Sequence, residues 1–133
     1  MSRVAVNELM KHAKEHKYAV GYFESWNLES TLAVVRAAEN MKSPVIIGVC
    51  GTYLGEPKRA YKESLTVYQA MLAQIAEEAA VPVALLLNEA DDEDMVIRAS
   101  QCGFDMVMFA PVFASEALPL QELTQIQKRI AAE

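Results

Sequence analysis

The sequence predicts an α/β protein in which parallel β-strands alternate with amphipathic helices. The stretch Val81-Pro82-Val83-Ala84-Leu85-Leu86-Leu87 is continuously apolar, a pattern typical of a strand buried on both faces of a parallel sheet. The rest of the chain repeats one unit, an apolar strand followed by polar residues and then by a helix with apolar residues at helical spacing. The 133 residues contain no linker or low-complexity run, so one domain covering residues 1–133 is expected.

An initial helix and four strand–helix units can be placed along the chain from apolar periodicity. The expected helices are residues 7–16, 28–41, 65–79 and 91–101, and a last helix with the apolar stripe Leu120, Leu123, Ile126 and Ile130. The expected strands are residues 18–23, 45–50, 81–90 and 104–109. Asn7 and Asn27 are the expected N-caps of the first two helices, and Gly103 is the expected left-handed residue that ends the fourth.

The polar residues that follow the strands are the candidate functional positions, because ligands bind at the carboxyl ends of strands in α/β folds. Residues 51–57 form the longest stretch without periodicity, so a loop is expected there and is a candidate active-site loop. Asn88 and Glu89 fall at the end of the apolar third strand. The alternative is that these two residues only open a loop and cap the helix that starts near Asp91.

The composition excludes several classes of function. A net charge of -6 argues against binding to nucleic acid or to an anionic membrane. No run approaches the roughly 18 apolar residues of a membrane span. The N-terminus is polar and lacks the apolar core of a signal peptide.

The cysteines and histidines give no strong motif. Cys50 and Cys102, in an acidic chain of this size, indicate reduced thiols and a cytoplasmic location. His12 and His16 are four residues apart on one helix face, a spacing that can hold a metal. The lysines around them favour a solvated basic face instead.

Four strand–helix units are compatible with two architectures. One is a small open sheet with helices on both faces, and the other is an arc of a (βα)₈ barrel, half of the usual eight units. In both cases the crossovers are expected to be right-handed.

Six short stretches, in order along almost the whole chain, resemble the class II ketose-bisphosphate aldolases. They are Tyr18-Ala19-Val20-Gly21-Tyr22-Phe23, Asn27-Leu28-Glu29, Ala37-Ala38-Glu39, Ser43-Pro44-Val45-Ile46-Ile47, Val81-Pro82-Val83-Ala84-Leu85, and Gly103-Phe104 through Val107-Met108. The resemblance implies a TIM-type (βα)₈ barrel, a metal that is usually zinc, and cleavage of fructose or tagatose bisphosphate in carbohydrate metabolism. It implies that this chain is a (βα)₄ half barrel with an extra N-terminal helix, ending before the fifth strand.

The resemblance also shows where this chain departs from the family. Family members carry H-x-D-H where this chain has Leu86-Leu87-Asn88-Glu89. Asn88 stands in place of the aspartate that transfers the proton, and an amide cannot exchange a proton near neutral pH. Glu89 stands in place of a histidine that binds the metal, although glutamate can bind zinc through oxygen.

Further departures weaken the implied catalytic site. The family motif I-D-G-S after the fourth strand becomes Phe109-Ala110-Pro111-Val112, and the family asparagine after the first strand is Glu24. The resemblance places the other metal histidines and the phosphate-binding loops in the second half of the barrel. One strand of ligands cannot build a three-ligand catalytic site, so loss of the aldol reaction is expected.

A replacement site is the second reading of the strand tips. Glu24, Cys50, Asn88 and Glu89 are expected at the ends of the first three strands, which converge in a barrel, and Asn27 lies close by in sequence. A cluster of this kind can bind a metal or pair two carboxyl groups as acid and base. The alternative is a decayed site whose residues are tolerated. No histidine or lysine is expected beside Cys50, which argues against a nucleophilic role.

The two ends of a four-stranded sheet predict self-association. Strands one and four would both be apolar edges with unpaired backbone groups. Two copies can pair edge to edge and close a pseudo-eightfold barrel, so a homodimer or higher homo-oligomer is expected. The alternative is a flatter, flavodoxin-like monomer in which the first helix covers the open face.

The sequence is compatible with three hypotheses about function. The first is a non-catalytic binding or assembly protein, a pseudoenzyme with a sugar phosphate as candidate ligand and no cofactor expected except the zinc implied by the family. The second is a metal-dependent aldehyde-lyase that uses Glu89 as ligand and is completed by oligomerisation or a partner chain. The third is a fragment, either engineered or from a truncated gene. The changed H-x-D-H motif favours the first.

Overall fold

The centre of the molecule is a parallel sheet of four strands in the order β1-β2-β3-β4. The computed structural model describes residues 2–110 and 120–130. The strands are β1 (Gly21–Glu24), β2 (Val45–Cys50), β3 (Val83–Ala90) and β4 (Met106–Phe109). Sequential strands are neighbours throughout, as in an arc of a barrel and unlike doubly wound open sheets, in which the strand order reverses. The predicted parallel α/β fold is confirmed.

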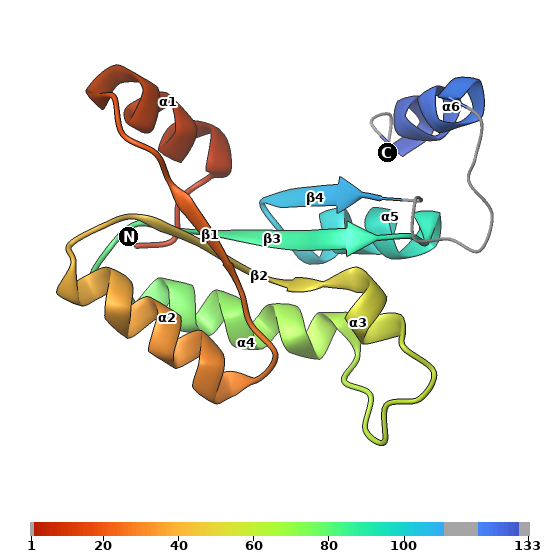
Figure 1. The fold of residues 1–133 in the computed structure, drawn as a ribbon, viewed down its shortest axis with the longest axis horizontal. Coiled ribbons are helices and arrows are strands. Elements are labelled where there is room, and N and C mark those ends of the chain that lie inside the picture. Colours follow the sequence, from red (N-terminus) through yellow and green to blue (C-terminus); the bar gives the residue numbers. More distant parts are fainter. Residues whose placement is uncertain (1, 111–119, 131–133) are drawn as a thin grey trace.

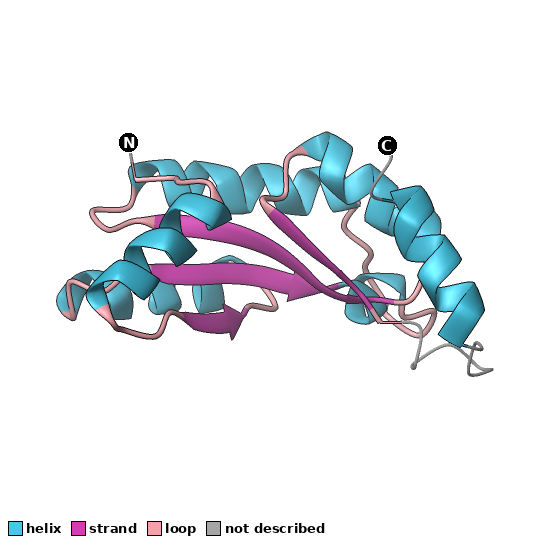
Figure 2. Ribbon diagram, turned by 90° about the horizontal axis from the view of Figure 1, so that it is seen from above, coloured by secondary structure: helices cyan, strands magenta, loops and turns pink. Residues whose placement is uncertain are grey.

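The helices lie on both sides of this sheet (Figure 1). In the described residues they are α1 (Val6–His16), α2 (Leu28–Asn40), α3 (Gly51–Gly55), α4 (Leu65–Glu78), α5 (Glu93–Cys102) and α6 (Leu120–Ile130). Figure 1 shows α1 on one side of the sheet and α2 and α4 on the other, and Figure 2 shows the twist of the strands between the helices. None of the helices in the described ranges is long and apolar enough to cross a membrane.

Alternation along the strands divides the apolar core into two parts. On the outer face, side chains of β2 and β3 pack with α2, α4 and α5; the fully buried members include Ile47, Val49, Leu72, Leu85, Leu87 and Val96. On the opposite face, here called the inner face, Ile46, Ala84 and Leu86 pack against Leu9 of α1. The inner face is the one that would line a closed barrel.

The first helix covers only part of the inner face. Leu86 is 5% exposed beside α1, whereas Met106, its register partner on β4, is 37% exposed and Met108 is 47% exposed. The structure therefore lies between the two sequence-based expectations, since α1 shields the inner face of β2 and β3 and leaves that of β4 open.

The expected loop at residues 51–57 is wrong, because α3 begins directly after the last residue of β2. Gly51 permits this tight connection. A Cβ atom at Gly51 would lie 2.7 Å from the Cα of Ala90, so only glycine lets the start of α3 approach β3 so closely. A five-residue helix is too short to leave a clear apolar period in the sequence.

The expected role of Asn7 is also wrong. The first helix begins at Val6, its N-cap residue is Ala5, and no side chain caps it. Asn7 is therefore an exposed residue of the first turn. Gly103 does end α5 in the left-handed conformation, with φ of 103°, as predicted.

The first and fourth strands are shorter than their apolar runs predicted, because the first residues of each run bond to the end of the preceding helix. The backbone N–H of Tyr18 bonds the carbonyl oxygen of Ala13 in α1, and that of Phe104 bonds Ala99 in α5. The first and fourth strands therefore start at Gly21 and Met106 rather than at residues 18 and 104.

The C-terminal helix lies where its apolar stripe predicted it. Within α6, Ile126 is buried at 6% exposure. Pro111 and Val112 of the predicted fourth-strand motif lie outside the described residues.

Candidate functional site

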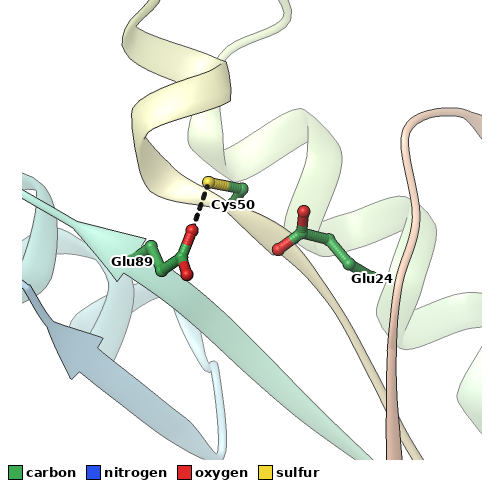
Figure 3. Close-up of side chains that lie close together, drawn as sticks. All are labelled: Glu24, Cys50 and Glu89. Atoms are coloured by element: carbon green, nitrogen blue, oxygen red, sulfur yellow. Dashed lines mark hydrogen bonds between the residues drawn. The ribbon is translucent and has the colours of Figure 1, made fainter. Parts of the chain in front are cut away.

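The carboxyl ends of β1, β2 and β3 bring together Glu24, Cys50 and Glu89 (Figure 3). One ligand atom from each of the three side chains lies within 4.8 Å of the other two. Cys50 Sγ is 3.5 Å from Glu89 Oε2 and donates to it. We call these three residues the Glu-Cys-Glu cluster.

Strand register accounts for two of its members. Glu24 pairs with Gly48 of β2, so their side-chain positions share a face of the sheet. Cys50 follows Gly48 by two residues and therefore points to the same inner face. Gly48 is required here, because a Cβ at that position would lie 1.9 Å from the carbonyl oxygen of Leu86 on β3. The close approach of β2 and β3 at Gly48 holds their two tips side by side.

Glu89 reaches the cluster by an irregularity in β3. Asn88 pairs with Cys50, so regular alternation would turn the next side chain away, toward the helices. Glu89 instead has a left-handed backbone with φ of 48°, and the register with β4 shifts between Leu87 and Ala90. A bulge of this kind re-aims a side chain. The carboxylate of Glu89 consequently points toward Cys50 (Figure 3).

Two neutral side chains orient Glu24. Asn88 Nδ2 donates to Glu24 Oε2 at 3.1 Å, and the Tyr22 hydroxyl donates to the same oxygen at 3.2 Å. Asn88 does not cap α5, because Asp92 is the N-cap and its side chain accepts from the N–H of Asp94. The reading of Asn88 and Glu89 as simple helix caps is therefore wrong.

The electrostatics of the cluster are negative. The pKa of Tyr22 is raised far above its ordinary value, first by burial, then by the negative charge of Glu24 and its hydrogen bond, with smaller contributions from Cys50 and Glu89. Neither Glu24 nor Glu89 forms an ion pair with any residue in the described part of the chain. The site thus gathers acidic groups without a positively charged partner.

The thiol of Cys50 is buried and has a hydroxyl neighbour. Its side chain is 5% exposed, and Sγ lies 2.8 Å from Thr52 Oγ1 in the first turn of α3. Thr52 belongs to the stretch 51–57 that was predicted to be a candidate active-site loop, but it was not singled out, and it lies in α3. Tyr22 was missed as well, although its position two residues before Glu24 on one strand face was the available signal.

Asn27 and the two histidines do not join the cluster. The Asn27 side chain accepts from the N–H of Ser30 at 2.8 Å and forms a capping box at the start of α2. The rings of His12 and His16 stack on each other with centroids 4.0 Å apart on α1, and His12 Nδ1 lies 2.8 Å from the Tyr18 hydroxyl.

The donor types of the cluster, and the spacing of its one hydrogen-bonded pair, fit those of a zinc site. Zinc takes thiolate sulfur at about 2.3 Å and carboxylate oxygen at about 2.0–2.2 Å in tetrahedral geometry, which separates donors by about 3.3–3.8 Å. The observed sulfur–oxygen distance of 3.5 Å lies in that range. Three protein donors would leave the fourth position open, as in catalytic zinc sites.

Comparison with known proteins identifies the family and the fold that the chain resembles. A family model described as "Fructose-bisphosphate aldolase class-II" matches residues 4–130. A "Probable fructose-bisphosphate aldolase" of Bacillus subtilis (strain 168) is 37% identical over 111 residues, covering 81% of this chain and 37% of that protein. A "Sulfofructosephosphate aldolase" of Alkalicoccus urumqiensis is 30% identical over 131 residues, covering 98% of this chain and 42% of that protein.

A solved structure shows the same arrangement of strands and helices. The crystal structure of a putative fructose-1,6-biphosphate aldolase from Coccidioides immitis superimposes with a TM-score of 0.78 and 25% identity, over 96% of this chain and 42% of that chain. The predicted (βα)₄ arc of a TIM-type barrel is therefore confirmed. The chain spans about two fifths of the length of the curated relatives described above.

Proposed function

The chain belongs to the class II fructose-bisphosphate aldolase family, and from this premise we propose that it binds a ligand at its strand tips without carrying out aldol cleavage. The observation that carries the proposal is the side chain of Asn88, an amide that donates to Glu24. The family resemblance places the proton-transferring aspartate at this position. Loss of a positioned general acid–base group typically costs about 10²–10⁴-fold in rate.

The surroundings of Asn88 support a holding role in place of proton transfer. Its amide fixes one oxygen of Glu24 together with the Tyr22 hydroxyl. Neither donor ionises near neutral pH. The amide of Asn88 is not acidic, and burial and the neighbouring negative charges raise the pKa of Tyr22. The tip of β3 is thus organised to hold side chains in position.

We also propose that a second copy of the chain supplies the missing edge partners. The strands β1 and β4 end the sheet in the described part of the chain. Phe23 on β1 is 54% exposed, and Met106 and Met108 on β4 are 37% and 47% exposed. Pairing of β4 with β1 of another copy would cover these residues and complete an eight-stranded ring.

A second candidate function is favoured by one specific observation. Glu89 stands where the resemblance places a metal ligand, and the bulge in β3 turns its carboxylate toward Cys50. A metal-dependent aldehyde-lyase, completed by a second copy or another chain, would use this carboxylate as ligand. The sugar phosphates named for the relatives in Bacillus subtilis and Alkalicoccus urumqiensis give the substrate class to examine.

An assay of aldol cleavage distinguishes the two functions. Protein of known oligomeric mass is incubated with fructose or tagatose bisphosphate, after loading with Zn²⁺ and again after chelation, with a full-length class II aldolase as positive control. We expect no triose phosphate above the blank in either state. Zinc-dependent cleavage that Glu89→Gln abolishes, and that the exposed control Glu29→Gln retains, would establish the lyase instead.

A further inference from the structure

We infer that Arg59 and Ser25 bind the phosphoryl group of a small ligand on the helix side of the sheet. Ser25 comes from the connection between β1 and α2, and Arg59 comes from the connection between α3 and α4. With Trp26 and Tyr53 they form what is here called the arginine corner. The inference goes beyond the proposed function, because none of these residues belongs to the Glu-Cys-Glu cluster.

Two buried polar atoms without a partner carry the first step. Among the residues that the structure describes, Ser25 Oγ and Arg59 Nη1 are the buried side-chain atoms that form no hydrogen bond. Ser25 is fully buried, and the side chain of Arg59 is 12% exposed. Buried polar groups are nearly always hydrogen-bonded, so an open hydroxyl and an open cationic N–H indicate a place for a group that accepts from them.

Aromatic rings bring these two side chains into one corner. The guanidinium of Arg59 lies over the ring of Tyr53, 4.0 Å from its centroid. The ring of Trp26, the residue after Ser25, packs edge to face against the same ring with centroids 4.5 Å apart. The hydroxyl of Tyr68 donates to the carbonyl oxygen of Ser25 at 2.8 Å. Burial raises the pKa of Tyr68 and the positive charge of Arg59 opposes that rise, so the guanidinium lies near this hydroxyl as well.

The strand turns Ser25 away from the acidic cluster. The N–H of Ser25 bonds the carbonyl oxygen of Gly48 at 2.9 Å, so the residue continues the pairing of β1 with β2 past Glu24. Successive side chains of a strand point to opposite faces, which places Glu24 on the inner face and Ser25 on the outer face. An anion in the arginine corner is therefore separated from the carboxylates of the cluster by the strand itself.

Local charge also favours an anion at this corner. The stretch from Glu56 to Glu63 carries three cationic residues, Lys58, Arg59 and Lys62, against the two glutamates at its ends. Both lysines are exposed. In a chain with a net charge of -6, this locally basic stretch would attract an anionic ligand that most of the surface repels.

The donor types select the class of ligand. A guanidinium is a planar donor that pairs with phosphate and carboxylate oxygens. Nη2 of Arg59 already bonds Glu63 Oε2 at 2.5 Å, which leaves Nη1 for a second acceptor. A phosphoryl group presents three acceptor oxygens, so one group can accept from Nη1 and from the Ser25 hydroxyl. Trp26 is 45% exposed and offers an apolar wall for the rest of the ligand.

Calorimetric titration tests the inference without an activity assay. The full chain is titrated with inorganic phosphate and with fructose 6-phosphate at constant ionic strength. We expect saturable binding of one ligand per chain, and a melting temperature that rises with ligand concentration. Equal affinity for the two probes would show that the phosphoryl group alone is recognised, and tighter binding of the ester would add contacts to the sugar. Both results support the inference.

Matched charge variants identify the cation. Arg59→Gln should weaken binding by about 10–100-fold, the range expected for loss of a hydrogen bond to a charged group. Lys58→Gln removes the same charge from an exposed neighbour and should keep the affinity within about 2-fold. Glu63→Gln removes the carboxylate that competes for the guanidinium, so it should strengthen binding.

Ser25→Ala separates a ligand contact from a structural role. The hydroxyl has no partner in the folded chain, so its removal should leave the ligand-free melting temperature unchanged or raise it. The same change should weaken phosphate binding by about 3–10-fold, because the bound ligand loses one hydrogen bond. A residue with only a structural role would not give this combination.

Three results would overturn the inference. The first is no saturable binding of either probe by the unchanged chain. The second is equal affinity in Arg59→Gln and Lys58→Gln. The third is binding that Asn88→Ala abolishes and Arg59→Gln retains, which would place the anion at the strand tips. Melts of the ligand-free variants separate misfolding from loss of a contact.

Discussion

The hydroxyl of Tyr68 is a buried polar group that joins a helix to the strand carrying Glu24. It donates to the carbonyl oxygen of Ser25 at 2.8 Å, and the side chain is 3% exposed. Burial is the first cause that raises the pKa of Tyr68 to about 12, and nearby Tyr53 and Glu63 add to it. The hydrogen bond fixes Ser25, the residue after Glu24, to α4. It therefore helps to hold Glu24 in its place in the Glu-Cys-Glu cluster.

The Tyr68 hydroxyl should make the stability of the chain depend on pH in the alkaline range. The folded-state pKa of Tyr68 lies above the reference value of 10.0, so the unfolded chain releases the proton first as pH rises. The stabilisation is complete below pH 10 and falls as pH rises toward 12. Tyr68→Phe removes this titration and leaves the Ser25 carbonyl without its donor, so we expect a loss of about 1–3 kcal/mol at neutral pH and a shallower alkaline decline.

Urea unfolding between about pH 7 and pH 11 measures both effects, with Tyr61→Phe as control. Tyr61 is 85% exposed, so its replacement should leave the free energy of unfolding almost unchanged. An alkaline decline equally steep in Tyr68→Phe and in the unchanged chain would contradict the assignment.

The sequence predicted the site residues whose side-chain direction follows from regular alternation along a strand. It failed where the backbone departs from that alternation. Glu24, Cys50, Asn88 and Glu89 were expected at strand tips, and the structure brings them together. The left-handed backbone of Glu89 could not be predicted, because glutamate is not one of the residues that commonly adopt this conformation. Without the bulge, alternation alone would have placed Glu89 on the outer face.

At the scale of elements, the two expected asparagine caps have different outcomes. Asn27 caps α2 through a reciprocal box with Ser30, whereas Asn7 lies inside α1 and caps nothing. The two asparagines differ because an N-cap residue has an extended backbone. The direction from which the chain enters the helix decides which residue takes that position. The N-terminal arm pairs with β3 through Val4 N–H and the Val83 carbonyl, and this pairing brings the chain into α1 two residues early.

The pair of asparagines provides a controlled test of helix capping. Asn27→Ala removes the acceptor for the Ser30 N–H, and we expect it to lower the free energy of unfolding by about 1 kcal/mol. Asn7→Ala changes an exposed side chain with no capping role and should stay within about 0.5 kcal/mol of the unchanged protein. Chemical denaturation of both variants measures the difference, and equal losses would refute the capping box as the source.

Element prediction was accurate for long periodic segments and failed for α3. The helices α2, α4 and α6 lie close to their predicted ranges because each carries several turns of apolar spacing. The five residues of α3 carry one turn, which periodicity cannot detect. Its start lies so close to Ala90 of β3 that a Cβ atom at Gly51 would collide with it. Thr52, the neighbour of the Cys50 thiol, lies in the stretch predicted to be a candidate active-site loop, although the stretch is helical.

At the scale of the whole molecule, the inner face of the sheet is only partly covered. The helix α1 protects the inner side of β2 and β3 through Leu9, whereas Met106 and Met108 of β4 stay open. The strands β1 and β4 both present a free backbone edge in the described part of the sheet. Exposed apolar edges of this kind template pairing with another chain. The sequence predicted these edges from the number of strand–helix units, but the partial cover by α1 depends on packing that only the structure reveals.

The proposed pairing of β4 with β1 of a second copy should make the chain self-associate. Sedimentation equilibrium of the unchanged chain should give the mass of a dimer or a larger homo-oligomer. The double change Met106→Lys and Met108→Lys places two positive charges on the open inner face, where burial in a closed ring would be costly, and should shift the mass toward the monomer. The control is Val67→Lys on α4, which alters a 62% exposed apolar residue away from the edges and should keep the oligomer. An unchanged chain that is monomeric and melts in one cooperative transition would refute the pairing, because the open face of β4 would then be stable in water.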